Sequence, residues 1–186
     1  MKTQIWAHRG ASAYAPENTL EAFRLAAEMG ADGVELDVQL SRDGELVVAH
    51  DETIDRVSNG TGYIKDYTLA QLKELSFNRL FPAFKDARIP TLLEVYELLK
   101  PAGLTVNVEL KTGIILYPEI EEKVLALTAS MGMEDRVIYS SFCHPSLVRL
   151  KELDSGLKTG LLYSDGWIDA AAYGRHTVGA DALHPA

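Results

Sequence analysis

Short apolar runs alternate with segments of helical periodicity along most of the chain. Six runs have the length and composition of strands, and the segments between them carry apolar residues at every third or fourth position. Repeated strand–helix units predict a parallel sheet with helices outside. The predicted strands are residues 4–7, 33–40, 104–111, 136–142, 158–163 and 181–184, and the predicted helices are 18–30, 91–99, 118–127, 145–153 and 168–173.

One stretch departs from this alternation. Residues 45–50 return as a strand after a turn that contains Asp43-Gly44, which predicts a hairpin attached to the second strand. Residues 51 to about 90 are expected to form an insertion, in which a capping box from Thr68 to Gln71 begins a short helix. Since there is no internal repeat or linker, we expect residues 1–186 to form a single domain.

The second predicted strand carries the most informative chemistry. Strand side chains alternate between two faces, so Glu35, Asp37 and Gln39 share one face and the apolar residues between them share the other. Two carboxylates on one face repel each other and raise their own pKa values unless a cation or a protonated partner lies between them, and a divalent metal is the simplest resolution. Because the ligands are oxygens, the pattern predicts Mg²⁺ or Ca²⁺ rather than zinc. The alternative is a sheet whose polar face is exposed to solvent.

Other polar clusters stand at the ends of other predicted strands. They are His8-Arg9-Gly10, His50-Asp51 and Glu109-x-Lys111. A parallel barrel builds its active site at the ends of several strands, which favours a functional role for both histidines. Alone, Glu109 and Lys111 would fit an ion pair on one strand face, but three acids with one lysine need a cation. Asn18 fits either a helix N-cap or a substrate contact.

Composition limits the function classes. Of 186 residues, 18 are Lys or Arg and 27 are Asp or Glu, giving a formal charge of −9 that argues against nucleic acid or an anionic membrane as the main partner. The single cysteine, Cys143, excludes an internal disulfide and fits a reducing compartment. There is no apolar signal segment and no run of about 20 apolar residues, so we expect a cytoplasmic protein without membrane insertion.

Six short motifs follow one another in order over residues 5–111. They are His8-Arg9-Gly10, Pro16-Glu17-Asn18-Thr19, Glu35-x-Asp37, His50-Asp51, Ile89-Pro90-Thr91-Leu92 and Glu109-x-Lys111. In this order the motifs resemble the glycerophosphodiester phosphodiesterase family, and a weaker resemblance continues to the end of the chain. The resemblance implies an α/β fold, a TIM-type (β/α)8 barrel, with a small insertion that matches residues 51–90.

The resemblance also implies an activity. This is metal-dependent hydrolysis of glycerophosphodiesters, such as glycerophosphocholine or glycerophosphoethanolamine, to sn-glycerol 3-phosphate and an alcohol. The implied roles are metal ligands for Glu35, Asp37 and Glu109, acid/base catalysis for His8 and His50, phosphate binding for Arg9 and Lys111, and support of the site for Glu17 and Asn18.

The chemistry of a phosphodiester agrees with these residue types. Hydrolysis needs charge neutralisation, which a divalent ion and basic side chains supply, and proton transfer near neutral pH, which histidine suits. Spacing does not reveal which histidine is the acid and which the base. The nucleophile also stays open between water and a neighbouring glycerol hydroxyl.

The length departs from the family pattern. A (β/α)8 barrel usually needs about 250 residues, so we expect roughly the last two βα units to be missing. We expect this chain to be part of a longer protein; the alternative is that another chain fills the gap. Two rivals remain: a barrel phosphodiesterase acting on lipids, of the lysophospholipase D or phosphatidylinositol phospholipase C type, and a catalytically inactive binding module. Lipid substrates would favour an apolar rim, and the sequence offers no obvious one. The oligomeric state stays open.

Overall fold

Six parallel strands form a curled sheet in the computed structural model, which describes residues 3–186. Their order is β1-β2-β4-β5-β6-β7, and β3 pairs antiparallel with β2, as the predicted hairpin requires. The strands are β1 (Trp6–His8), β2 (Gly33–Leu40), β3 (Leu46–Val48), β4 (Thr105–Leu110), β5 (Val137–Ser141), β6 (Thr159–Tyr163) and β7 (Ala182–Pro185). The alternation of strands and helices predicted from the sequence is confirmed.

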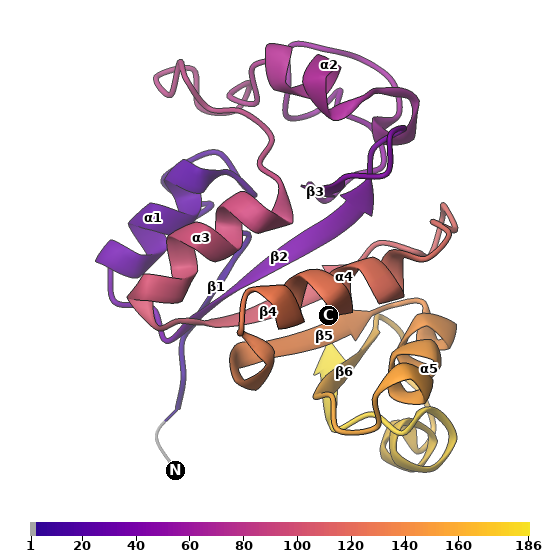
Figure 1. Cartoon of the computed structure of the whole chain (residues 1–186). Coiled ribbons are helices and arrows are strands. Elements are labelled where there is room, and N and C mark those ends of the chain that lie inside the picture. Colours follow the sequence, from indigo (N-terminus) through magenta and orange to yellow (C-terminus); the bar gives the residue numbers. More distant parts are fainter. Residues whose placement is uncertain (1–2) are drawn as a thin grey trace.

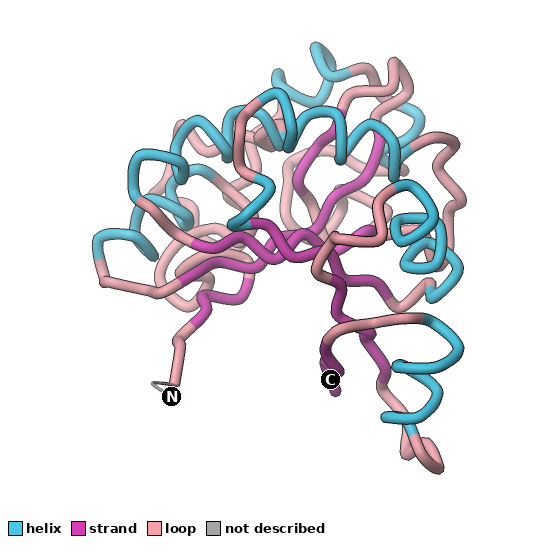
Figure 2. The backbone as a smooth tube through the Cα atoms, turned by 60° about the horizontal axis from the view of Figure 1, so that its bottom comes forward, coloured by secondary structure: helices cyan, strands magenta, loops and turns pink. Residues whose placement is uncertain are grey.

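Helices cover the outer face of this sheet, and the strands curve beneath them (Figures 1 and 2). The α-helices are α1 (Leu20–Glu28), α2 (Leu69–Glu74), α3 (Leu92–Ala102), α4 (Ile120–Ser130), α5 (His144–Leu153) and α6 (Ala170–Ala172). Shorter turns of other helix types are η1 (Ile64–Asp66), η2 (Glu134–Arg136) and η3 (Tyr173–Val178), of which η3 is a π-helix.

Local capping explains where several helices begin and end. The Thr19 hydroxyl accepts a hydrogen bond from the backbone N–H of Ala22, so Thr19 is the N-cap of α1. A reciprocal capping box between Thr91 and Glu94 begins α3. Gly103 follows α3 with a φ of +73°, in the left-handed region that glycine favours at helix ends.

The alternation of side chains in β2 divides the molecule into a core and a polar interior. Val34, Leu36 and Val38 are fully buried in the hydrophobic core under the helices. The opposite face carries the acidic residues, and the strand register places Asp37 opposite Glu109 of β4. The fold therefore brings acids far apart in the sequence to the same level of one face.

The insertion has a small core of its own above β3, around α2 (Figure 1). Its buried apolar side chains are Val47, Ala49, Ile54, Ile64, Leu72, Phe77 and Ile89. This cluster holds the segment that follows His50 against the end of the sheet.

Three details of the predicted elements are wrong. Pro118 does not belong to the first turn of the helix after β4. That helix, α4, begins at Ile120, and Glu119, which stands between Pro118 and Ile120, is its N-cap with a φ of +62°. The helical segment near residue 170 begins at Ala170 and continues as η3 to Val178, where Gly179 ends it. The helix predicted to run to residue 99 extends to Ala102.

The sheet is open at both edges within residues 3–186. There, β1 pairs only with β2 and β7 pairs only with β6, which gives a curled half-barrel consistent with a TIM-type arrangement. The expectation that two further βα units belong to the barrel stays a prediction. In the same residues, no helix combines the length and apolarity needed to cross a membrane.

Candidate active site

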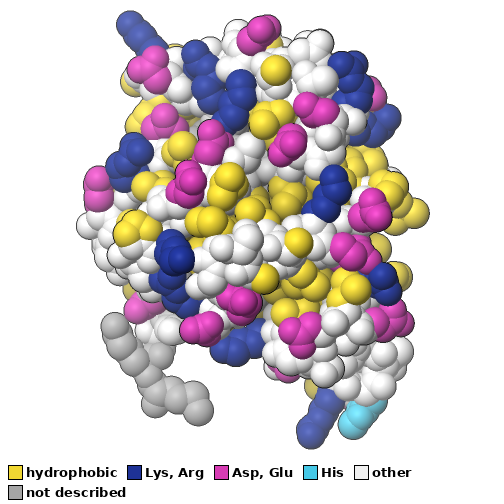
Figure 3. Space-filling model, in the orientation of Figure 1, with side chains coloured by type: hydrophobic (Ala, Val, Ile, Leu, Met, Phe, Trp, Pro, Cys, Tyr) yellow, Lys and Arg dark blue, Asp and Glu magenta, His cyan; other side chains and the backbone are white. Residues whose placement is uncertain are grey.

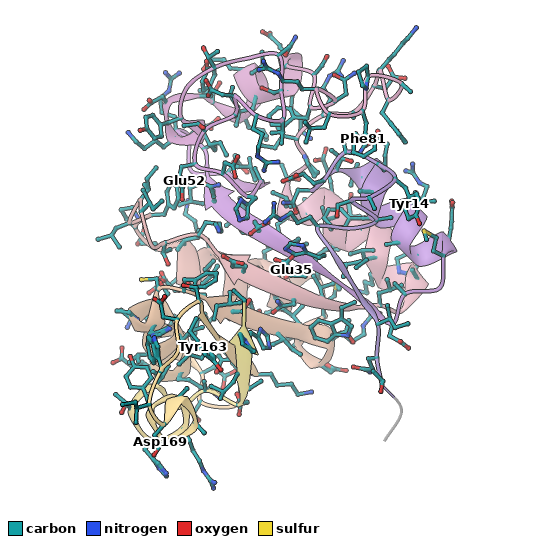
Figure 4. All side chains as sticks on the ribbon, turned by 180° about the vertical axis from the view of Figure 1, so that it is seen from behind. Tyr14, Glu35, Glu52, Phe81, Tyr163 and Asp169 are labelled. Carbon is teal, nitrogen blue, oxygen red and sulfur yellow. The ribbon has the colours of Figure 1, made fainter. Side chains whose placement is uncertain are left out.

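Three carboxylates meet on the face of the sheet turned away from α3 and α4. One oxygen from each of Glu35, Asp37 and Glu109 lies within 4.8 Å of the other two. Figure 4 shows Glu35 projecting from β2 on this face. Asp37 is fully buried and the other two carboxylates are nearly so, which makes their mutual repulsion costly.

The electrostatics of this cluster reflect its burial. Burial and the neighbouring charges of Asp37 and Glu109 raise the pKa of Glu35 to about 8. Burial and Asp37 also raise the pKa of Glu109. Lys111 partly offsets this repulsion: its Nζ donates to Glu109 Oε1 at 2.9 Å and lies 3.8 Å from Asp37 Oδ1. The ion pair considered from the sequence therefore forms, but as part of the acidic cluster.

The cluster fits a divalent cation such as Mg²⁺ or Ca²⁺. Its candidate ligands are carboxylate oxygens from two adjacent strands, the atom type that these hard cations prefer. The Oδ1 atom of Asp37 is buried and has no hydrogen-bond partner among the protein atoms. A buried anionic oxygen without a partner is costly, and a cation between the three side chains would satisfy it.

Asn18 supports the central carboxylate from the segment before α1. Its side-chain amide donates to Asp37 Oδ2 at 2.8 Å, and its backbone has a φ of +56°. The N-cap role considered for Asn18 belongs to Thr19, which frees the Asn18 side chain for this contact. The hydrogen bond places the Asn18 amide against the central carboxylate, and the supporting role of Asn18 in the reaction stays a prediction.

Arg9 joins the end of β1 to the same cluster. With a φ of +57°, its backbone N–H donates to Glu35 Oε2 at 3.1 Å. Its guanidinium Nη1 donates to Glu17 at 3.0 Å, and its Nε lies 3.6 Å from Asp37 Oδ2. The adjacent Gly10 also has a positive φ, and a Cβ there would lie 2.7 Å from the carbonyl carbon of Ala22. The tight turn in this motif therefore requires glycine.

The two histidines lie in different environments. His50 Nδ1 lies 2.6 Å from Asp51 Oδ1, and the pKa of Asp51 is lowered to about 2 because hydrogen bonds from Arg56 and His50 outweigh its burial. An ionised carboxylate only accepts, so the hydrogen bond places a proton on Nδ1 of His50 and leaves Nε2 outside this contact. His8 is 69% exposed and its Nε2 lies 3.8 Å from Glu35 Oε2. Burial of part of its ring and the charge of Arg9 lower the pKa of His8.

Comparison with known proteins agrees with the geometry. The sequence pattern of the Glycerophosphoryl diester phosphodiesterase family matches residues 8–186. The chain belongs to this family. The resemblance recognised from the sequence motifs is thus confirmed.

Individual family members share most of this chain. A protein of Caldanaerobacter subterraneus named glycerophosphodiester phosphodiesterase is 52% identical over 170 residues, which are 91% of this chain and 70% of that protein. A phosphodiesterase of Oleispira antarctica, solved in complex with the product sn-glycerol-3-phosphate, superposes with a TM-score of 0.85 at 33% identity and covers 98% of this chain and 74% of its own. A glycerophosphodiester phosphodiesterase of Thermotoga maritima gives a TM-score of 0.76 at 34% identity, over all of this chain and 74% of its own.

Sequence reasoning missed Arg56, which stands at the centre of a salt-bridge network in this family member. Its guanidinium donates to both oxygens of Glu17 at 2.7 Å and to Asp51 at 2.7 Å. Glu17 and Asp51 thereby share one cation, and the pKa of Arg56 is raised. No motif marks this arginine, because its position depends on how the insertion packs.

Gln39 was recognised on the acidic face but not as a structural support. It is fully buried, and its amide nitrogen donates to the backbone carbonyls of Ala49, His50 and Asp51 at 2.8–3.2 Å. The hydroxyl of Tyr117 donates to Gln39 Oε1 at 2.9 Å, which sets the orientation of the amide. This pair ties the segment that carries His50 to the strand that carries the acids.

Proposed function

We propose that this chain hydrolyses glycerophosphodiesters to sn-glycerol 3-phosphate and an alcohol with the aid of a divalent cation. The observation that carries the proposal is the buried carboxylate cluster of Glu35, Asp37 and Glu109, to which His8 and Arg9 lie adjacent. Family membership and the product bound to the Oleispira antarctica relative support the choice of substrate.

The cation, bound by the three carboxylates, would neutralise phosphoryl charge and help to orient the reacting groups. Asn18 holds the central ligand, Asp37, through one oxygen and leaves the other for the ion. Lys111 adds a positive charge beside the cluster, and the fork of Arg9 suits a phosphate oxygen. These side chains bind the anionic diester at the carboxyl ends of the strands.

The two histidines would move the protons. His50 presents Nε2 because Asp51 holds its Nδ1 proton, so this atom is available to accept a proton or, once protonated, to donate one. His8 lies at the end of β1 with its Nε2 atom 3.8 Å from Glu35 Oε2, and its lowered pKa favours the neutral ring near pH 7. One histidine would deprotonate the nucleophile and the other would protonate the leaving oxygen. The assignment between them stays open.

The setting of the reaction is also proposed. We infer a cytoplasmic location and a single domain from the sequence alone. Family membership supports glycerophosphodiesters as substrates, and we propose deacylated headgroup diesters such as glycerophosphocholine among them. The rival from another class, an inactive binding module, is disfavoured by the presence of His8, His50 and all three carboxylates in one chain.

The test is release of sn-glycerol 3-phosphate from glycerophosphocholine and glycerophosphoethanolamine, with Mg²⁺, with Ca²⁺ and with a chelator. We expect release that depends on the cation and falls by at least about 10²-fold in His8→Ala and His50→Ala. Ile5→Ser, an exposed change before β1, is the matched control. If the folded protein binds glycerophosphocholine but never cleaves it with any divalent cation, the binding-module alternative holds.

A further inference from the structure

A series of hydrogen bonds connects the two motifs that carry Arg9 and His50. The guanidinium of Arg9 donates from Nη1 to Glu17 Oε1 at 3.0 Å, and Arg56 donates to both oxygens of Glu17 at 2.7 Å. Arg56 also donates to both oxygens of Asp51, at 2.7 and 3.2 Å, and Asp51 Oδ1 lies 2.6 Å from His50 Nδ1. We call this series of contacts the Arg56 network.

The planar guanidinium of Arg56 allows one side chain to bind two carboxylates. One edge, Nη1 and Nη2, faces Glu17, and the other edge, Nε and Nη2, faces Asp51. Within residues 3–186, the Glu17 carboxylate makes its other hydrogen bond to Arg9. In the same part of the chain, the Asp51 carboxylate makes its other one to His50. Each carboxylate therefore depends on Arg56 for its second anchor.

The insertion fixes the backbone that carries Arg56. Ile54 and Ser58, two residues away on either side, are fully buried, and Ile54 belongs to the small core of the insertion. The hydroxyl and the backbone N–H of Ser58 both donate to the carbonyl of Ile54, at 2.7 and 3.0 Å. The turn around Arg56 is held on both sides, so the insertion presents the guanidinium from a fixed position.

Arg56 differs from the ordinary ion pairs on the surface of this protein. Acidic and basic side chains are interspersed over the outer face of the helices (Figure 3), and Arg149 of α5, which donates to Glu122 of α4, forms one such pair. Exposed pairs of this kind contribute little to stability. The partners of Arg56 are less exposed, at 14% for the Glu17 side chain and 29% for that of Asp51, and each also binds a residue of the proposed site.

The Arg56 network also determines which nitrogen of His50 carries the proton. Burial alone would raise the pKa of Asp51, but hydrogen bonds from Arg56 and His50 lower it to about 2, so Asp51 is an ionised acceptor. The protonated nitrogen of a neutral histidine is set by the hydrogen bonds that the ring makes. A carboxylate that Arg56 holds beside Nδ1 therefore keeps the proton there and makes Nε2 available for proton transfer.

We propose that Arg56 is a positioning residue, which fixes the phosphate-binding Arg9 and the proton-transferring His50 relative to each other. It acts through its two carboxylate partners and not by contact with the substrate. The inference rests on the proposed function, which assigns those roles to Arg9 and His50. Because small misplacements of reacting groups lower the rate strongly, the loss of Arg56 is expected to lower kcat.

Steady-state hydrolysis of glycerophosphocholine tests this role at a temperature where every variant is folded. Lysine keeps the charge of Arg56 but lacks the planar fork, so we expect both Arg56→Lys and Arg56→Gln to lower kcat at least tenfold. Arg149→Gln is the matched control, because Arg149 also donates twice to one carboxylate, and its kcat should equal that of the wild type. A wild-type kcat in folded Arg56→Gln would overturn the proposal.

A double mutant separates positioning from a general loss of packing. Asp51→Asn removes the carboxylate through which Arg56 acts on His50. Adding Arg56→Gln to Asp51→Asn should therefore lower kcat by less than about threefold further, with the remaining effect, through Glu17, seen as a rise in KM. An additional loss of kcat as large as that of Arg56→Gln alone would contradict the route through Asp51.

Nitrogen NMR of the His50 ring gives a readout that does not depend on activity. We expect the tautomer with the proton on Nδ1 in the wild type and in Arg149→Gln, and a mixture of tautomers in Arg56→Gln at the same pH. An unchanged tautomer in Arg56→Gln would overturn the proposal even if kcat falls. If the tautomer changes but the wild type cleaves no glycerophosphodiester, Arg56 still positions His50 and only the proposed function fails.

Discussion

The support that Gln39 gives to the His50 segment makes a quantitative prediction. Gln39→Leu keeps a side chain of similar size but removes the amide. The backbone carbonyls of residues 49–51 lose their donor, and the hydroxyl of Tyr117 loses its acceptor. The substitution therefore tests whether a single buried amide holds a catalytic segment in place.

The magnitude follows from which of these groups are buried. Ala49 and Tyr117 are 6% and 7% exposed, so water cannot replace their lost partner, whereas His50 and Asp51 are partly open to solvent. An unsatisfied buried group costs about 1–3 kcal/mol. Two such groups give an expected loss of about 2–6 kcal/mol in the free energy of unfolding. A displaced His50 also predicts a fall in kcat of tenfold or more, because small misplacements of reacting groups are costly.

Urea unfolding and steady-state hydrolysis of glycerophosphocholine measure the two effects. Tyr117→Phe removes only the hydroxyl that orients the amide, and we expect a smaller loss of about 1 kcal/mol. Tyr63→Phe is the matched control, because Tyr63 is 46% exposed. In the folded Gln39→Leu protein, the pH dependence of kcat should also change, since the position of His50 relative to Asp51 changes.

One result would refute this reasoning. If Gln39→Leu unfolds within about 0.5 kcal/mol of the wild type and keeps its kcat, the hydrogen bonds in the structure carry no positioning role. A loss of stability with an unchanged kcat would leave Gln39 as a purely structural residue.

Three further predictions concern the rest of the site. Gly10→Ala should lower the free energy of unfolding by about 2 kcal/mol or more, because its Cβ adds a clash with Ala22 to the strain of a positive φ. Gly30→Ala has a similar φ but open space around its Cβ, so we expect a loss of only about 1–2 kcal/mol. Urea unfolding measures the difference between the two variants. Arg56 favours ionised Asp51 in the folded state, where the pKa of Asp51 is lowered to about 2. The stability that this ion pair contributes is therefore fully present above the unfolded pKa of 3.8 and is lost as the pH falls towards 2. Asp51→Asn should flatten this part of the plot of stability against pH, which urea unfolding between pH 5 and pH 2 measures. Mg²⁺ or Ca²⁺ at one hundred times its Kd should stabilise the protein by about 2.7 kcal/mol, seen as a rise in Tm that Asp37→Asn removes.

Elements with strong local signals could be predicted from the sequence. The bounds of β2 match those predicted, because alternating acidic and apolar residues specify a strand with two different faces. The capping boxes at Thr68 and Thr91 begin helices for local reasons and were found where expected. The end of α3 was less predictable because Pro101 lies inside its last turn, where a proline usually indicates that a helix has already ended. The segment after Pro118 was less predictable because the positive φ of Glu119 has no clear local sequence signal.

Long-range partners could not be predicted in the same way. Arg56 contacts Glu17, which lies 39 residues away, and Tyr117 contacts Gln39 across 78 residues. These contacts depend on how the insertion and the loop after β4 pack against the sheet, and no local periodicity encodes that packing. The exposure of the loop after β4 could not be predicted for another reason. The run Ile114-Ile115-Leu116 suggests burial, and only the folded chain leaves two of these residues exposed.

The burial of Asp37 separates the two interpretations that the sequence left open for the acidic strand. A sheet with a solvated polar face would leave its carboxylates in water, where hydration offsets their charge. Asp37 is instead fully buried, and the chain surrounds it with Asn18, Arg9 and Lys111. These partners approach the edges of the cluster, but Oδ1 still lacks a hydrogen bond and faces two further acids. A fold that buries a charge and leaves one oxygen without a partner favours a ligand that completes the site, and a divalent cation is the ligand whose charge and chemistry match it.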